Sequence, residues 1–93
     1  MDIKITTVDI NEEYEIVQAI FAIDSHTGGF LSEVDPNKAF DGVKQQLKQK
    51  AISLGCNAII GCQFEYRNAL ADGFMGKKQA IEIFAYGTAV KVI

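Results

Sequence analysis

The strand-like segments of this chain are apolar on both faces, and this restricts the folds that the chain can adopt. Successive side chains of a strand point to opposite faces of a sheet, so a sheet with one face in water alternates apolar and polar residues. The segment 14–25 breaks this rule, with Val17, Ala19, Phe21 and Ile23 on one face and Tyr14, Ile16, Ile20 and Ala22 on the other. The segment 57–67 places in one row Ala58, Ile60, Cys62, Phe64 and Tyr66. Both faces of the predicted sheet therefore need a cover.

Only one helix is available to cover them. Asp35 and Pro36 are typical of a helix start, because Asp accepts bonds from free backbone N–H groups and Pro lacks the N–H that would be unpaired there. Gly55 is typical of a helix end. Between these signals, apolar residues recur at spacings of three and four, namely Phe40, Val43, Leu47, Ala51 and Leu54. We expect a helix over 36–54 whose single apolar stripe covers one face.

The other elements complete an α+β fold with the order β-β-α-β-β. Strands are predicted over 3–10 and 14–25, paired antiparallel, and over 57–67 and 79–93. The segments 26–34 and 68–78 are predicted to be loops, since each contains two glycines and no apolar period. In the last strand, the apolar phase changes near Tyr86–Gly87, which predicts a β-bulge there. We expect one domain over 1–93, with an antiparallel sheet packed on one long helix.

The uncovered face predicts self-association. Burial of one large apolar side chain is worth about 1.5 to 3 kcal/mol, against the roughly 5 to 15 kcal/mol that keeps a domain folded. Contact with further copies of the chain would bury these residues. The alternative is a small closed barrel that hides them within one subunit.

Composition excludes several classes of function. The 93 residues include 12 acidic and nine basic side chains, a net charge of -3, so a protein with a basic nucleic-acid-binding surface is excluded. Two cysteines do not form a disulfide framework and fit a reducing compartment, so we expect a cytoplasmic protein. The opening Met-Asp-Ile-Lys is unlike a signal peptide, and the longest apolar run, 19–23, is far short of the roughly 20 residues of a membrane span. We expect neither nucleic acid nor membrane as a partner.

Two motifs resemble the YbjQ-like family of small bacterial proteins. They are 51–61, which reads Ala-Ile-Ser-Leu-Gly-Cys-Asn-Ala-Ile-Ile-Gly, and 85–90, which reads Ala-Tyr-Gly-Thr-Ala-Val. Family members carry Leu-Gly-Ala-Asn-Ala-Val-Val-Gly after a helix and end in Gly-Thr-Ala-Val. The opening Ile5-Thr6-Thr7 and the second strand are also similar to the family. Between His26 and Phe40 this chain is shorter than those relatives, so nothing that their longer segment does is carried over.

The resemblance implies a subunit similar to the dodecin-like folds that assembles into a ring, typically a homopentamer. The family is labelled as heavy-metal-binding, without a settled set of ligands or an established activity. For the motif residues we expect structural roles. Gly55 would end the helix, Asn57 would bond to the backbone of the turn, and Gly61 would allow a close approach or a bulge. Gly87 and Thr88 belong to the closing motif.

The candidate metal ligands are Cys62, Cys56 and His26, with Asp24 and Met75 as further donors. The two cysteines are six positions apart, wider than the usual spacing of a closed zinc site. Cys62 also falls in an apolar row, where a free thiol packs as a small hydrophobic group. A site that several subunits share around a symmetry axis remains open. We expect no tight binding of a divalent or soft metal ion.

No catalytic constellation is present in the sequence. The single histidine, His26, has no motif around it, and no phosphate-binding or dinucleotide-binding glycine motif occurs. We therefore expect a non-enzymatic, homo-oligomeric binding or scaffold domain, whose ligand would lie at subunit interfaces. One alternative is a metal-handling protein that uses the ligands above. Another is an enzyme with a composite site of Tyr86, Glu82 and His26 from neighbouring subunits.

Overall fold

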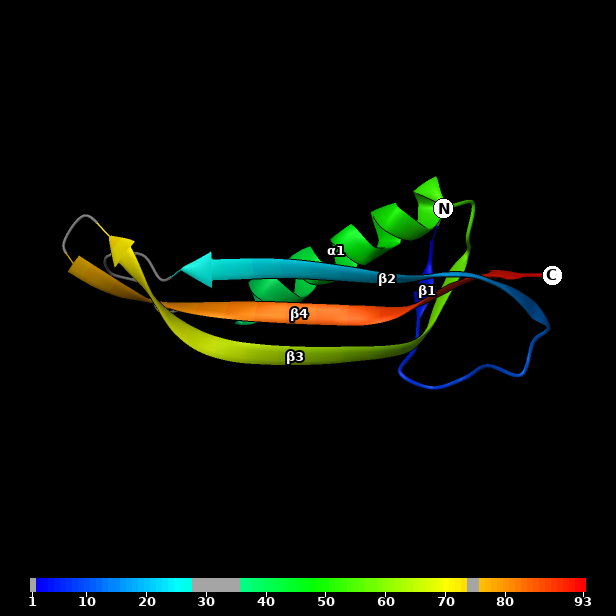
Figure 1. Cartoon of the computed structure of the whole chain (residues 1–93), viewed down its shortest axis with the longest axis horizontal. Coiled ribbons are helices and arrows are strands. Elements are labelled where there is room, and N and C mark those ends of the chain that lie inside the picture. The colour runs from blue at the N-terminus through cyan, green and yellow to red at the C-terminus, as the bar shows by residue number, and fades with distance from the viewer. Residues whose placement is uncertain (1, 28–35, 74–75) are drawn as a thin grey trace.

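In the described residues, four strands form one sheet, and one helix lies across one of its faces (Figure 1). The structure is a computed structural model that describes residues 2–27, 36–73 and 76–93. Its elements are β1 (Lys4–Ile5), β2 (Tyr14–Thr27), α1 (Pro36–Ser53), β3 (Ala58–Gly73) and β4 (Gly76–Val92). The strand order across the sheet is β1-β3-β4-β2. The predicted α+β class and element order are confirmed.

The predicted pairing of the first two strands is wrong. β1 has only two residues and pairs parallel with β3, through Lys4↔Ala58 and Ile5↔Ile59, at the opposite edge of the sheet from β2. The sheet is therefore mixed, not antiparallel throughout. The chain between β1 and β2 returns over the face away from α1, where Ile10 packs on Ala58, Ile60 and Val90. Burial of Ile10 favours this crossing over a short hairpin, because it covers part of the second face from within the chain.

The predicted loop over 68–78 is also wrong, because β3 and β4 remain paired as far as Gly73↔Gly76. No proline interrupts either strand, so the backbone ladder continues beyond the end of the helix. The long hairpin makes the molecule elongated, with extents of 52 × 21 × 17 Å (Figure 1). Its radius of gyration is 15.7 Å, whereas a compact domain of this length has about 12 Å. β2 is likewise longer than predicted, because its last two residues, 26 and 27, fall within the predicted loop 26–34; the rest of that loop and the cap Asp35 lie outside the described residues.

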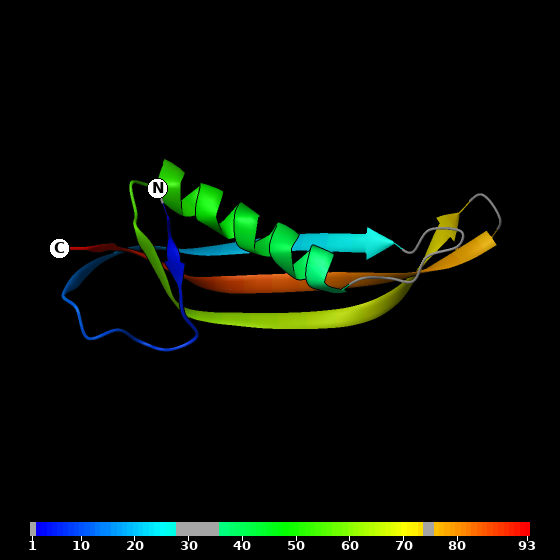
Figure 2. The ribbon, with the colours of Figure 1, turned by 180° about the vertical axis from the view of Figure 1, so that it is seen from behind.

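Helix α1 packs its apolar stripe on the sheet and runs obliquely across the strands (Figure 2). Ala39, Val43, Leu47 and Ala51 are buried, and the aromatic ring of Phe40 lies 5.7 Å from that of Phe64. The helix ends as predicted at Gly55, which has a φ of +75°. The Cys56 N–H donates to the Ala51 carbonyl at 2.8 Å, and the Gly55 N–H donates to the Ile52 carbonyl at 3.0 Å. These two bonds form a Schellman motif.

The predicted bulge at Tyr86–Gly87 is not in β4. The register shifts lie in the strands on either side of it, between Ile16 and Gln18 of β2 and between Ile60 and Gln63 of β3. Each bulge moves the later side chains of its strand to the other face. Strand β4 keeps its alternation, with Ala89 in the core under α1 and Val90 in the cluster on the other face. Both faces are apolar there because the helix covers one and the segment around Ile10 covers the other.

Candidate functional site

The face of the sheet away from α1 exposes a group of apolar side chains in the middle of the molecule. Phe21 pairs with Tyr86 and Ile23 pairs with Phe84, so the four side chains lie side by side on β2 and β4. Phe21 is 71% exposed, Ile23 48% and Tyr86 46%. We call this surface the open face, and it comprises Ile16, Ala19, Phe21, Ile23, Phe84 and Tyr86. Exposed apolar side chains that lie side by side in this way are typical of an interaction surface.

The β3 side of the same face is polar. Gln63, Glu65 and Arg67 pair in turn with Tyr86, Phe84 and Glu82. Arg67 Nε donates to Glu82 Oε1 at 2.8 Å, and its guanidinium carbon lies 5.7 Å from the centroid of the Phe84 ring. These charged residues are not among the candidate site residues predicted from the sequence. The alternation of polar and apolar residues in 63–67, Gln-Phe-Glu-Tyr-Arg, is the sequence pattern that indicates a polar face there.

The two candidate cysteine ligands are free thiols buried in the core. Cys56 follows the helix end and is 1% exposed, and Cys62 lies in the β3 bulge and is 0% exposed. Burial raises the pKa of both thiols above the ordinary value of 9.0, and the charge of Lys91 partly offsets the rise for Cys56. Metal ions bind the thiolate, so a raised pKa opposes ligation at neutral pH.

The other candidate ligands do not join these thiols in a described site. His26 pairs with Ile81 through its backbone, but its side chain and Met75 lie outside what the structure describes. Asp24 lies between β2 and α1, where its Oδ1 accepts a bond from the Ser25 N–H at 3.0 Å. No group of three or more His, Cys, Asp or Glu side chains that could hold a metal ion occurs in the described ranges.

The motif residues 55–61 and 87–88 have contacts that explain their types. Asn57 Oδ1 accepts from the Val92 N–H at 2.7 Å, and its Nδ2 donates to the Val92 carbonyl at 3.4 Å. Gly61 has a φ of +59° at the β3 bulge. Gly87 faces this bulge, and Thr88 pairs with Ile60 and is half-buried. These residues hold the end of the helix and the bulged strand against β4.

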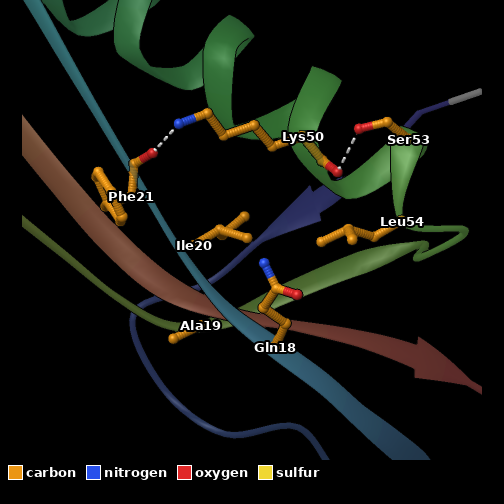
Figure 3. A pocket seen from close by; sticks show the side chains of 7 residues that line it. All are labelled: Gln18, Ala19, Ile20, Phe21, Lys50, Ser53 and Leu54. Carbon is orange, nitrogen blue, oxygen red and sulfur yellow. Dashed lines mark hydrogen bonds between the residues drawn. The ribbon is translucent and has the colours of Figure 1, made fainter.

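One pocket, of about 280 Å³, lies between the C-terminal part of α1 and the outer edge of β2 (Figure 3). Its lining residues are Gln18, Ala19, Ile20, Phe21, Lys50, Ser53 and Leu54. Lys50 Nζ donates to the Phe21 carbonyl and lies 4.9 Å from the Phe21 ring centroid. Ser53 Oγ donates to the Gln49 and Lys50 carbonyls. Two of the polar groups at this pocket are thus engaged within the chain.

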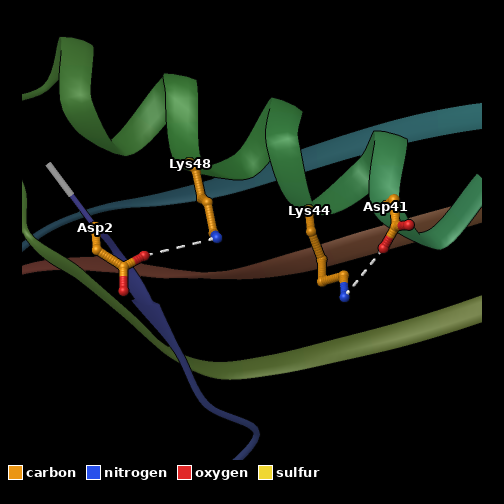
Figure 4. Close-up of polar contacts among 4 residues, drawn as sticks. All are labelled: Asp2, Asp41, Lys44 and Lys48. Atoms are coloured by element: carbon orange, nitrogen blue, oxygen red, sulfur yellow. Dashed lines mark ion pairs between the residues drawn. The ribbon is translucent and has the colours of Figure 1, made fainter.

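Two lysines of α1 form ion pairs with nearby acids. Lys44 Nζ lies 3.4 Å from Asp41 Oδ1, and Lys48 Nζ lies 3.9 Å from Asp2 Oδ1 (Figure 4). These pairs are partly exposed and contribute little stability, but they reduce the positive charge of this side of the helix. A second pocket of about 310 Å³ near Asp2 is lined by Asp2, Lys4, Ile10, Glu12, Asn57, Ala58 and Val92. Within the described part of the chain, no helix has the length and hydrophobicity to cross a membrane.

Comparison with known proteins gives a family but no established activity. The family model YbjQ_1, described as "Putative heavy-metal-binding", matches residues 16–93. A crystal structure of a protein of unknown function from Pediococcus pentosaceus ATCC 25745, assigned to the DUF74 family, is similar with a TM-score of 0.71. The two sequences are 29% identical, and the match covers 98% of each chain. No curated protein matches this chain. The match over 16–93 confirms the predicted resemblance, and the chain belongs to the YbjQ_1 family.

Proposed function

We propose that this chain is the subunit of a homo-oligomer, and that it acts as a non-enzymatic binding or scaffold domain. The observation that supports the proposal is the open face. Phe21 is 71% exposed and Ile23 48% exposed in the isolated subunit, whereas α1 and the segment around Ile10 cover other apolar parts of the sheet. Burial of such side chains between copies favours association by about 1.5 to 3 kcal/mol for each one buried completely.

We propose a closed ring of about five copies as the form of this assembly. The family resemblance implies a ring, and each subunit offers one apolar open face, bordered on β3 by Gln63, Glu65 and Arg67. When the patch of each copy contacts a different surface of the next copy, the copies form a closed ring if the rotations between neighbours add up to a full turn. A ligand, if the assembly has one, would then lie between subunits.

The described side chains support a binding role better than catalysis. Tyr86 and Glu82, two members of the alternative composite site, are four residues apart on β4 and therefore about 13 Å apart along the strand. Glu82 is already bonded to Arg67. Neither residue has a described acid, base or nucleophile arranged against it within one subunit.

The assembly is tested by the mass of the purified protein in solution. Light scattering after size-exclusion chromatography at micromolar concentration is expected to give about five times the subunit mass of 10.2 kDa. Analytical ultracentrifugation over a hundredfold range of concentration separates a closed ring from open-ended association, since only the ring keeps one mass. A monodisperse monomer would contradict the proposal.

Metal binding is the second candidate function, and the family description favours it. The ligands proposed are Cys62, Cys56 and His26, gathered from more than one subunit. Because both thiols are buried, we expect weak binding and fewer than one ion per chain. Calorimetry of the reduced protein with Zn²⁺ tests this. Tight binding of one ion per chain, lost in both Cys56→Ala and Cys62→Ala, would make metal handling the leading function.

A further inference from the structure

The two edges of the sheet are protected to different degrees. At the β2 edge, the Lys50 ammonium donates to the Phe21 carbonyl and Gln46 Nε2 donates to the Ile23 carbonyl at 2.9 Å. A register shift at Val17 also distorts this edge. Engaged carbonyls, positive charge and a bulge are the means by which proteins prevent edge strands from pairing with another chain.

After its bulge, the outer edge of β3 has no comparable protection from the described residues. β1 and the segment after it bond only to the first part of β3, where the Cys62 N–H donates to the Thr6 carbonyl at 2.9 Å. From Gln63 onward, no described strand pairs with this side of β3. The edge is exposed to solvent there, and Tyr66 is 65% exposed. A long bare edge strand readily pairs with a strand of another molecule.

The bonds at the β2 edge show which β3 backbone groups point outward. Phe21 and Ile23 direct their carbonyls away from β4, so Ala22 between them directs its N–H and carbonyl toward β4. The alternation then carries across β4, so Glu65 and Arg67 bond inward and their even-numbered neighbours present free N–H and C=O groups to the outside. Tyr66 lies at the centre of these outward-facing residues.

We propose that β3 pairs antiparallel with β3 of a second copy, about a two-fold axis at Tyr66. In this register, Tyr66 faces its own counterpart as a hydrogen-bonded pair, and Phe64 faces Asn68 of the other copy in the same way. Glu65 then lies directly opposite Arg67 of the other copy, twice in each dimer. Opposite charges at facing positions stabilise a strand pair, and like charges destabilise it. The contact uses an edge and not the open face, so it does not rest on the proposed ring.

A cysteine at the axis tests the pairing. Facing residues of a hydrogen-bonded antiparallel pair have Cα atoms about 5.5 Å apart, within the range of a disulfide. Tyr66→Cys is therefore expected to form a covalent dimer under mild oxidation, seen on a non-reducing gel. Asn68→Cys is the matched control, because position 68 is about 13 Å along the strand from its own counterpart. The native thiols are buried. Equal cross-linking of the two variants, or none in Tyr66→Cys, would overturn the proposal.

Charge reversal in the Tyr66→Cys background tests the register. Glu65→Arg gives chains that repel each other, and so does Arg67→Glu, so each alone is expected to cross-link about tenfold less. Mixed together, the two variants restore both attractive pairs, and a mixed disulfide dimer is expected at the parental yield. Cross-linking yields that do not change with these charges would overturn the proposed register. Ile23→Lys on the open face is expected to leave the cross-link unchanged, and loss of the cross-link there would overturn pairing through the edge.

Discussion

A Cβ atom on Gly87 would lie 3.0 Å from Cγ2 of Ile59 and 3.2 Å from Cα of Cys62. The bulge of β3 brings its backbone this close to β4, and backbone cannot move aside as a flexible side chain can. Gly87→Val is therefore expected to lower the free energy of unfolding by about 2 to 3 kcal/mol. For a domain of this size, that lowers Tm by roughly 10 °C or more.

Thr88→Val is the control for this substitution. It introduces the same side chain one position along β4, where Thr88 is half-buried, and is expected to change Tm by little. Thermal unfolding of both variants distinguishes a specific close approach from a general intolerance of valine at this part of the strand. A Gly87→Val protein that melts within a degree of the parent would show that the strands do not approach this closely.

Gly42 and Asp24 are coupled across the helix–sheet contact. Asp24 Oδ2 lies where a Cβ of residue 42 would be, so alanine at this helical position displaces the carboxylate. Alanine in place of a mid-helix glycine ordinarily stabilises by about 1 kcal/mol. We expect Gly42→Ala alone to be near neutral, because it also disturbs the bond from the Ser25 N–H to Asp24, and to be stabilising when Asp24→Ala is present.

Chemical unfolding of the double-mutant cycle measures this coupling directly. The single and double variants should give a coupling energy of about 1 kcal/mol. Additive effects would contradict the contact between the helix and Asp24.

The helix and the element order could be predicted because their signals are local. Pro36 and Gly55 mark the helix ends, and a spacing of three and four residues from Val43 to Ala51 marks the buried face. The pairing of Lys4 with Ala58 could not be predicted in this way. It joins residues more than 50 positions apart, and it is accompanied by burial of Ile3 in the main core and partial burial of Ile10 on the far face, which no local pattern records.

The candidate site was predictable only in part, for a related reason. The apolar residues of the open face, such as Phe21 and Ile23, follow from the strand period. The bulges at Val17 and Gly61 change which residues share a face. The glycine at position 61 predicts a close approach or a bulge there, and the structure confirms a bulge, but no local signal marks the bulge at Val17. The predicted bulge at Gly87 is wrong, because Gly87 is the small residue opposite the β3 bulge and not the bulged residue itself.

Asn57 bonds to both backbone groups of Val92 at the end of β4 and not, as predicted, to the backbone of its own turn. Asn57→Ala removes both bonds and is expected to lower the free energy of unfolding by about 1 to 2 kcal/mol. Asn57→Asp keeps the acceptor for the Val92 N–H but not the donor, so it should be less destabilising than alanine. Urea unfolding ranks the two variants, and equal stability of Asn57→Ala and the parent would contradict this role.

The buried thiol of Cys62 makes stability depend on pH in the alkaline range. Burial raises its pKa in the folded state above the ordinary 9.0, so the unfolded chain loses the proton first as the pH rises. The contribution of the neutral thiol is complete below pH 9 and is lost above it, by at most about 1.4 kcal/mol per pH unit. Unfolding measured from pH 7 to pH 10.5 should show a steeper loss in the parent than in Cys62→Ala. Parallel curves would contradict burial of this thiol.

The most direct test of the account is the mass of two matched isoleucine variants. Ile23 on the open face and Ile52 on α1 have similar exposure, 48% and 41%, but only Ile23 lies on the surface proposed to bind other copies. Light scattering of Ile23→Lys is expected to show loss of the ring at micromolar concentration, leaving at most a dimer paired through β3, with circular dichroism that still indicates a folded chain. Ile52→Lys should keep the parental mass of about five subunits. An Ile23→Lys protein with the same mass as the parent, or a parent that is itself a monomer, would contradict the central claim.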